Sequence, residues 1–555
     1  MTAPTTTLAV PATAAPVGVW RGDDAPALDP AAIEAKLRRV DQPVTLITLD
    51  DRLAAVEGGA VWLGDEPTDG PAGRPALAHC PALSPERLGD AGFRIDHGLR
   101  FAYVAGAMAN GIASVDLVDA IARAGMLGFF GAAGLDPVRI EHAIDEFAQR
   151  GTPPRFGFNL IHSPNEPDLE KRVVDLYLRR GIRSIEASAY LALTPHVVRY
   201  RVSGLRRDPD GTIVAPNRIM AKVSRVEVAE RFLSPPPDRL LGPLVESGAI
   251  TREEADLARH IAMADDLTAE ADSGGHTDNR PALALLPTLM GLRDRLAEQH
   301  GTSKRIRVGA AGGIATPLSA AAAFAMGADY LVAGTVHQAC RESGTSDLVR
   351  RMLAEAGQAD VAMAPAADMF EMGVKVQVLK RGTLFAMRAG KLYELYRQYD
   401  RFESVPAGDR AKVEEFFQAS FEEVWLRCVD FFSTRDPKQL ERAERDPKHR
   451  MALAFRWYLG LSSHWANRGD AERKADFQIW CGPAMGAFNE WTRDSFLADP
   501  AARDIATVAT NLMFGASLAA RHHHLRDQGV AFPPSVTRIP PVPLASLAAI
   551  LEGRR

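Results

Sequence analysis

The sequence predicts an α/β protein whose central domain is a (β/α)8 TIM barrel, flanked by a small N-terminal α/β module and a C-terminal all-helical domain. Between Phe101 and Val336, short apolar runs alternate with helical stretches, a pattern typical of a parallel sheet. We count eight such runs, which is the number of strands that closes a barrel. From about Asp368 onward the strand signals stop and amphipathic helical runs follow.

The composition is that of an ordinary globular protein. The 555 residues are 46% apolar, and 70 acidic residues nearly balance 65 basic ones. This balance excludes a broad polybasic surface. The most apolar window, near residues 320–333, contains Asp329 and is shorter than the about 20 apolar residues of a membrane helix. We therefore expect neither nucleic acid nor a membrane as a partner.

The cysteines and the N-terminus indicate a cytoplasmic protein. Cys80, Cys340, Cys428 and Cys481 lie far apart without a CxxC pair. This spacing indicates neither a disulfide framework nor a zinc site, so no metal is expected. The first twenty residues carry no Lys or Arg, and prolines interrupt their apolar run, unlike a secretory signal.

Two N-terminal segments precede the barrel. Residues 1–30 are rich in Thr, Ala and Pro and predict a disordered leader, because little in them could offset the entropy of ordering. Residues 31–90 predict the small α/β module, with a helix at Ile33–Val40 and a strand at Val44–Leu49 between Pro and Gly turns.

The barrel is expected at residues 91–360. Its predicted strands are Phe101–Ala105, Met126–Phe130, Arg155–Leu160, Ser184–Ala187, Ile219–Val223, Asp265–Ala269, Ile306–Ala310 and Tyr330–Ala333. Two insertions interrupt the alternation: a hairpin with an Asp-Pro-Asp-Gly turn at about 198–216, and a helical excursion at about 233–260. We expect both to leave from C-terminal strand ends, where the catalytic loops of barrels lie, and so to shape a substrate pocket.

The helical domain is expected at 361–530, followed by a C-terminal tail at 531–555. Five of the seven tryptophans lie in this part, at Trp425, Trp457, Trp465, Trp480 and Trp491. They have two interpretations. They form the core of the domain, or some of them line a tunnel for a long apolar chain, since apolar side chains dominate small-molecule sites.

Two glycine turns, Val308–Ile314 and Tyr330–Thr335, lie at the ends of the seventh and eighth predicted strands, each before a helix. The corresponding loops of barrels commonly bind phosphate through backbone N–H groups. Glycine lets the backbone approach the phosphate oxygens, and Thr335 could add a hydroxyl donor. The alternative is that the glycines merely end strands.

Three polar residues are expected at the same end of the barrel as these turns and are candidate site residues. His276 lies in the polar loop 269–277, which we expect to be flexible, and is a general acid, a group that orients a bound ring, or a cap on a backbone carbonyl group. Asn159 and Lys222 end the third and fifth strands, beside the end of the first strand at 106–110. Asn159 matches the pyrimidine edge of a flavin, and Lys222 could stabilise charge on its ring, although both can be structural inside a barrel.

Several of these motifs resemble the FMN-binding barrels of the nitronate monooxygenase (2-nitropropane dioxygenase) superfamily. They are residues 106–114 (GAMANGIAS), 273–276 (SGGH), 311–313 (AGG) and 333–335 (AGT). Segments 101–135, 219–225, 455–465 and 476–489 resemble its PfaD branch, the trans-acting enoyl reductases of polyunsaturated fatty acid and polyketide synthases. The resemblance covers nearly everything after residue 31.

The resemblance implies a set of site residues. It implies FMN with its phosphate at Gly312, Gly313, Gly334 and Thr335, its ring near Ala107, Met108, Asn159 and Lys222, and contacts to Gly275 and Ala311. His276 aligns with the family histidine near the reactive face of the ring, which implies a catalytic role. One departure is that this loop reads Asp-Ser-Gly-Gly-His where many nitronate monooxygenases have Glu-Ala-Gly-Gly-His, so detailed oxidase chemistry does not carry over.

The activity that the resemblance implies is an NADPH-dependent enoyl reductase acting on a thioester held by an acyl carrier protein, for fatty acid or polyketide synthesis. Hydride would go to the β-carbon, and His276 or water would supply the α-proton. No GxGxxG motif is evident, so NADPH would have to enter the flavin mouth directly.

Two other functions are compatible with the sequence: a flavin oxidase of the nitronate monooxygenase type, and a non-catalytic assembly subunit of a synthase. A carrier protein would be acidic, and it could dock on the basic run formed by Lys375, Lys380, Arg381, Arg388 and Lys391. A solvated helix face explains the same run. The sequence is also compatible with a homodimer.

Overall fold

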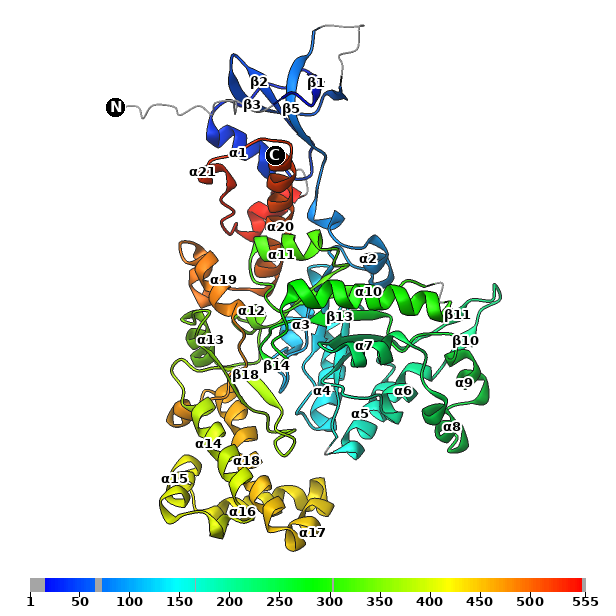
Figure 1. Ribbon diagram of the computed structural model, residues 1–555, viewed down its shortest axis with the longest axis vertical. Helices are drawn as coiled ribbons and strands as arrows, with labels where there is room; N and C mark the ends of the chain where they lie inside the picture. The colour runs from blue at the N-terminus through cyan, green and yellow to red at the C-terminus, as the bar shows by residue number, and fades with distance from the viewer. Residues whose placement is uncertain (1–14, 65–71, 165, 302–303, 552–555) are drawn as a thin grey trace.

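The computed structural model describes residues 15–64, 72–164, 166–301 and 304–551. Along its long axis, a small N-terminal sheet lies at one end, a barrel in the middle and a helical module at the other end (Figure 1). Within the described ranges, no helix is both long enough and apolar enough to cross a membrane.

The central domain is a closed barrel of eight parallel strands, as predicted. In chain order the strands are β6 (Tyr103–Ala105), β7 (Leu127–Phe130), β8 (Phe156–Ile161), β9 (Ser184–Ser188), β12 (Arg218–Val223), β13 (Asp266–Glu270), β15 (Arg307–Ala311) and β16 (Leu331–Ala333). Each lies within about two residues of a predicted strand, so the prediction of a TIM barrel is confirmed.

A helix follows each barrel strand. These helices are α3 (Val115–Arg123), α4 (Pro137–Arg150), α5 (Pro167–Arg180), α6 (Pro195–Val202), α7 (Val226–Leu233), α10 (Ala282–His300), α11 (Pro317–Ala325) and α12 (Thr335–Gln338). Residues at the two ends of each helix determine where it begins and ends. In α4, the Asp136 side chain caps the first turn, Pro137 opens the helix and Gly151 ends it with a φ of 59°.

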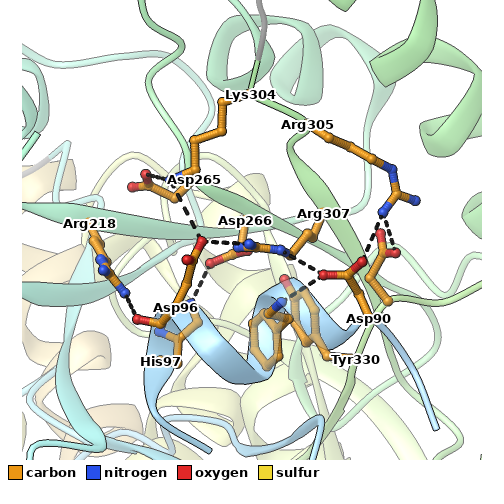
Figure 2. A network of polar contacts seen from close by, with 12 residues as sticks. Asp90, Asp96, His97, Arg218, Asp265, Asp266, Lys304, Arg305, Arg307 and Tyr330 are labelled. Atoms are coloured by element: carbon orange, nitrogen blue, oxygen red, sulfur yellow. Dashed lines mark hydrogen bonds and ion pairs between the residues drawn. The ribbon is translucent and has the colours of Figure 1, made fainter. Parts of the chain in front are cut away.

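Helix α2 (Ala91–His97) lies across the N-terminal end of the barrel. Its Phe93 ring stacks on Tyr330, with the ring centroids 4.3 Å apart. Beside it, Arg307 Nη1 lies 3.3 Å from Asp266 Oδ1 in a network of ion pairs (Figure 2). Asp266 and Arg307 are the first residues of β13 and β15. This end of the barrel is therefore sealed, and a ligand has to enter from the other end.

Both insertions form the predicted elements but lie at the sealed end, so the expectation that they shape a substrate pocket is wrong. The hairpin of β10 (Arg206–Arg207) and β11 (Ile213–Val214) joins α6 to β12, and α8 (Asp238–Glu246) and α9 (Arg252–Ala258) join α7 to β13. A helix-to-strand connection reaches the N-terminal end of the next strand. A cavity opens at the other end of the barrel, and none of the described residues that line it comes from either insertion.

The N-terminal module is a five-stranded antiparallel sheet with one helix packed on it. Its order is β3 (Arg52–Glu57), β2 (Val44–Leu49), β5 (Arg74–Cys80), β1 (Gly18–Arg21) and β4 (Ala60–Leu63), and the helix is α1 (Pro30–Arg38). Strand β1 lies inside the expected disordered leader, which is therefore wrong from residue 15 onward. Composition did not reveal this strand, because its pairing partners are distant and its Trp20 is buried against them. Residues 1–14 lie outside the described residues.

The C-terminal helical region is confirmed, except at its start. There β17 (Val361–Pro365) and β18 (Lys375–Leu379) pair with each other, and β18 pairs with β14 (Gly275–His276) from a barrel loop. Helix α13 (Asp347–Ala354) precedes this sheet. The helices that follow it are α14 (Phe385–Gln398), α15 (Ala407–Phe417), α16 (Phe421–Arg435), α17 (Pro437–Arg445), α18 (Pro447–Arg468) and α19 (Ala484–Thr492), with short 3-10 helices at Phe402–Ser404, Ala471–Asp476, Phe496–Ala498 and Pro500–Ala502. One more 3-10 helix, Pro85–Arg87, lies before the barrel.

Helix α20 (Ile505–Asp527) runs back from the helical module, packs along α11 of the barrel and reaches the N-terminal sheet (Figure 1). Its buried Arg521 donates hydrogen bonds to the carbonyl oxygens of Leu37 at 3.1 Å and Val40 at 3.2 Å. The expected tail contains α21 (Pro534–Thr537) and α22 (Leu544–Leu551). The N-terminal module and the C-terminal helices α20 to α22 thus pack together.

Candidate active site

A cavity of about 720 Å³ opens at the C-terminal ends of the barrel strands. The loops that follow the strands form its floor, and residues of β18, α16 and α18 form the opposite wall. Every site residue predicted from the sequence lines it: Ala107, Met108, Asn159, Lys222, Gly275, His276, Ala311, Gly312, Gly313, Gly334 and Thr335. The structure thus brings the whole predicted set together in one cavity.

The glycine turn after β15 leaves backbone open to the cavity. Gly312 and Gly313 both have positive φ, at 83° and 75°. A Cβ on Gly312 would lie 2.7 Å from the carbonyl carbon of Ala271, so no side chain fits there. A Cβ on Gly313 would meet nothing within 4 Å. Bare backbone beside Gly334 and the start of α12 is what a phosphate group requires, and the phosphate role stays a prediction.

Lys222 lies between two carboxylates. Its Nζ is 3.7 Å from Glu186 Oε2 and 3.4 Å from Glu270 Oε1. Burial opposes the charge on Lys222, but the two carboxylates outweigh burial and raise its pKa. Burial also raises the pKa of Glu186, whose Oε2 accepts a hydrogen bond from the Ala107 N–H at 2.9 Å. The floor of the cavity therefore holds one cation that its neighbours keep charged.

Sequence reasoning missed both of these carboxylates. The available signal was their position, since Glu186 lies within the predicted fourth strand and Glu270 directly follows the sixth. A charged residue inside an apolar strand has to find a partner, because an unpaired buried charge is costly. That argument predicts a cation nearby, but the sequence alone does not say which one.

The side-chain NH2 group of Asn159 is hydrogen-bonded within the protein. Its Nδ2 donates to the backbone oxygen of Glu186 at 3.0 Å and to Ser188 Oγ at 2.8 Å. Both hydrogens of the amide are committed by these two bonds. The carbonyl oxygen of the side chain is the atom that can face a ligand. The Asn159 side chain therefore offers the cavity an acceptor, where the sequence left both roles open.

His276 forms an ion pair with a residue from outside the barrel. Its Nε2 lies 3.2 Å from Asp368 Oδ1, and the imidazole is half-buried. Burial lowers the pKa of His276, but the Asp368 carboxylate outweighs burial and the pKa lies above its usual value. Burial raises the pKa of Asp368, yet His276 outweighs it and the pKa is lowered. Sequence reasoning missed Asp368, because it lies in a segment after β17 that carries no signal of its own.

The loop that carries His276 is anchored, so the expectation of a flexible loop is wrong. Strand β14 pairs His276 with Val376 of β18. On the same strand, Gln377 Nε2 donates to Asp272 Oδ1 and to the Ser273 carbonyl oxygen, both at 2.8 Å. Because these partners lie about a hundred residues further along the chain, the local sequence could not predict them.

The tryptophans divide between the two interpretations. Trp457 and Trp480 line the cavity. Trp465 is buried and packs edge-on against Trp457, with the ring centroids 6.1 Å apart. Trp425 lies under the Arg450 guanidinium, and Trp491 donates a hydrogen bond to the Ile539 carbonyl oxygen. The tunnel interpretation therefore applies to two of the five rings.

The basic run expected to dock a carrier does not form one face. Arg388 is paired with the buried Asp476, and Lys391 Nζ lies 3.2 Å from Asp409 Oδ1. Arg381 Nη1 lies 3.7 Å from Asp360 Oδ2. Lys375 and Lys380 are exposed at opposite ends of β18. The run is therefore not a continuous basic patch, because part of it folds inward to meet acidic partners.

Two family models match the chain. One, described as nitronate monooxygenase, matches residues 97–389, which is more than half of the chain. The other, described as the inserted helical domain of [acyl-carrier-protein] S-malonyltransferase, matches residues 399–477. The first spans the barrel and the β17–β18 sheet, and the second spans α15 to α18.

The chain is also similar to solved and curated proteins. The crystal structure of the enoyl reductase domain of MlnA, from the macrolactin biosynthesis cluster of Bacillus amyloliquefaciens, is 39% identical with a TM-score of 0.74, covering 80% of this chain and 99% of that one. One polyunsaturated fatty acid synthase subunit of Thraustochytrium sp. is 49% identical over 79% of this chain and 30% of its own length. Polyketide biosynthesis protein PksE of Bacillus subtilis is 45% identical over 78% of this chain and 56% of its own length. The chain thus spans only part of both curated relatives.

Proposed function

The chain belongs to the nitronate monooxygenase family, in its PfaD branch, and from this premise we propose that it is a flavin-dependent enoyl reductase. The proposed reaction is the NADPH-dependent reduction of the α,β double bond of an enoyl thioester on an acyl carrier protein. The observation that carries the proposal is a charged Lys222 and a His276–Asp368 pair lining one cavity at the barrel mouth.

FMN is the proposed cofactor. Gly312, Gly313, Gly334 and Thr335 would hold its phosphate, and Ala107, Met108, Asn159, Lys222, Gly275 and Ala311 would surround the rest of it. The open backbone at Gly313 and the acceptor on Asn159 support this assignment. When bound, the flavin supplies the hydride transfer, which no protein side chain can supply. NADPH as the reductant rests on the family alone.

The protein side chains stabilise the developing negative charge and supply the proton for the α-carbon. Loss of the double bond builds negative charge on the thioester oxygen, and a proton has to reach the α-carbon. His276 stays protonated to a higher pH than an ordinary histidine, because Asp368 raises its pKa, so it can donate this proton. Lys222 keeps its positive charge in the same cavity and stabilises the developing negative charge.

A synthase carrier protein is the proposed partner. Relatives of this chain are named as a polyunsaturated fatty acid synthase subunit and a polyketide biosynthesis protein. The match of residues 399–477 to a helical domain of an acyl-carrier-protein transferase favours the same substrate class. We propose that the chain acts in trans on a carrier-bound thioester in the cytoplasm.

The test is an assay of the full chain, loaded with FMN, with NADPH and a crotonyl thioester on a carrier protein. We expect NADPH consumption to match the formation of the butyryl thioester. NADPH oxidation that needs air and yields no butyryl product, together with turnover of a nitronate, would instead indicate an oxidase. Protein that takes up no FMN and shows no flavin absorbance would indicate an assembly subunit.

A further inference from the structure

Over residues 451–466, helix α18 is buried except for one stripe that faces the cavity. Between residues 451 and 466, the partly exposed positions are Arg456, Trp457, Gly460, Leu461 and His464, and all of them line the cavity. Steps of three and four residues place these positions on one face of the helix. This stripe therefore forms a roof over the barrel mouth.

Gly460 lies at the centre of the stripe. A Cβ at this position would meet no heavy atom within 4 Å, and the residue is helical with no positive φ. Neither close packing nor backbone conformation therefore requires glycine here. Glycine inside a helix costs up to about 1 kcal/mol relative to alanine. What the glycine provides is room on the cavity side of the helix.

Two hydrogen-bonded contacts fix where this room lies. Asn110 Nδ2 donates to Ser463 Oγ at 2.7 Å, and Ser463 Oγ donates to the Gly460 carbonyl oxygen at 3.0 Å. One turn earlier, Arg456 Nε donates to the Ala367 carbonyl oxygen at 2.9 Å, next to the partner of His276. Gly460 thus lies between the loop that follows β6 and the His276 side of the mouth.

Apolar side chains of two helices lie next to this roof, beside charged residues of the same helices (Arg427, Asp430, Arg435 and Arg456) that also line the cavity. Cys428, Phe431 and Phe432 of α16 line the cavity together with Leu453, Trp457 and Leu461 of α18. Cys428, Phe432 and Leu453 are buried, whereas Phe431 is 49% exposed. The apolar lining therefore continues from the roof out to the surface. This row of apolar side chains fits a hydrocarbon chain, because it offers apolar contact area.

We propose that the acyl chain of the substrate lies along this row of apolar side chains beneath Gly460, and that Gly460 determines how long a chain the enzyme accepts. The inference rests on the proposed reductase function and deepens it. The charged groups that serve the thioester end, Lys222 and His276, lie on the barrel side of the cavity. The apolar side chains that α16 and α18 contribute are available to contact the acyl chain.

The test replaces Gly460 by alanine and by leucine in the FMN-loaded full chain. The matched control is Gly390→Leu in α14, where a Cβ also meets nothing within 4 Å and which is not among the described residues that line the cavity. We expect the ratio of kcat/KM for a dodecenoyl thioester to that for a crotonyl thioester to fall about tenfold or more in Gly460→Leu. The alanine variant is expected to give an intermediate ratio, and the control to leave the ratio unchanged. An unchanged ratio in both Gly460 variants overturns the inference.

A binding measurement separates this inference from the reductase proposal. Saturated dodecanoyl and butyryl pantetheine cannot be reduced, and their binding can be followed by isothermal titration calorimetry. We expect Gly460→Leu to weaken dodecanoyl binding more than butyryl binding. Equal effects on both chains overturn the role of Gly460. Length-dependent binding without reduction of any enoyl thioester overturns only the reductase proposal.

Discussion

At the scale of single residues, one carboxylate from outside the barrel determines the charge of His276. The Asp368 carboxylate raises the pKa of His276 against the opposing effect of burial. A general acid has to hold its proton, so the role that we propose for His276 requires activity to be present below this pKa and to be lost as the pH rises through it. The same raised pKa stabilises the folded protein at low pH, and that stability is lost over the same rise in pH.

Asp368→Asn tests this coupling. The substitution removes the charge and keeps the shape, so the pKa of His276 should fall and the upper limb of the pH profile of kcat/KM should move to lower pH. Asp430→Asn is the control, because Asp430 also lines the cavity and is not among the causes of the shift at His276. A limb that stays in place in Asp368→Asn would show that another group is the acid.

His276, Lys222 and the glycine turns at the cavity could be identified from the sequence, but the partners that control His276 and Lys222 could not. His276 and Lys222 follow or end predicted strands, and strand ends meet at one mouth in any barrel. Asp368 is 92 residues from His276 and reaches it only through the pairing of β14 with β18. Glu186 reaches Lys222 across neighbouring strands. The charge states of His276 and Lys222 depend on such contacts, and the periodicity of apolar residues in the sequence gives no information about them.

At the scale of elements, strand β18 holds the loop that carries His276 in place. Gln377→Leu removes both hydrogen bonds to Asp272 and Ser273 and should lower the free energy of unfolding by about 1–3 kcal/mol. We also expect faster amide hydrogen exchange across residues 272–276, measured by mass spectrometry. Exchange at the wild-type rate would mean that the β14–β18 pairing alone fixes the loop.

The hairpin β10–β11 should be dispensable for activity, since it lies at the sealed end of the barrel. Replacing its tip, residues 208–212, by Asn-Gly keeps a tight turn and should leave kcat/KM and chain-length preference unchanged. The assay is the same NADPH-linked reduction of crotonyl and dodecenoyl thioesters. A change in chain-length preference would place the hairpin at the substrate after all.

Elements with a local signal were predictable, and those with distant partners were not. The eight barrel strands carry their own apolar runs and turn residues. Strand β1 is short and becomes a strand only through pairing with distant segments, and β18 pairs both with the preceding β17 and with the distant β14. The insertions were placed at the wrong end because α6 and α7 precede them, and one helix reverses the direction of the chain across the barrel.

At the scale of the whole molecule, the barrel has one sealed and one open end, and separate parts of the chain cover each. The sealed end depends on Arg307, which bridges Asp266, Asp96 and Asp90 (Figure 2). The open end is completed by β18, α16 and α18, without which the cavity would have no roof. The sequence predicts that a helical module exists, but not that one face of α18 covers the barrel.

Arg307→Met tests how the sealed end contributes to stability. The substitution leaves the buried Asp266 without one of its cations, so we expect the free energy of unfolding in urea to fall by about 3 kcal/mol or more. Arg305→Met is the matched control, since this exposed arginine belongs to the same network and should cost less than about 1 kcal/mol. Equal losses in the two variants would contradict the role of burial. Activity at low temperature should be unchanged in both.

Central to the proposed function is that the reduced protein passes its electrons to an enoyl thioester. The most direct measurement mixes the FMN-loaded chain, reduced anaerobically with NADPH, with a crotonyl carrier protein or with oxygen, and follows flavin absorbance. We expect the crotonyl carrier to reoxidise the flavin faster than oxygen does and to yield the butyryl thioester. Rapid reoxidation by oxygen, with no reaction of the crotonyl carrier, would contradict the proposed function.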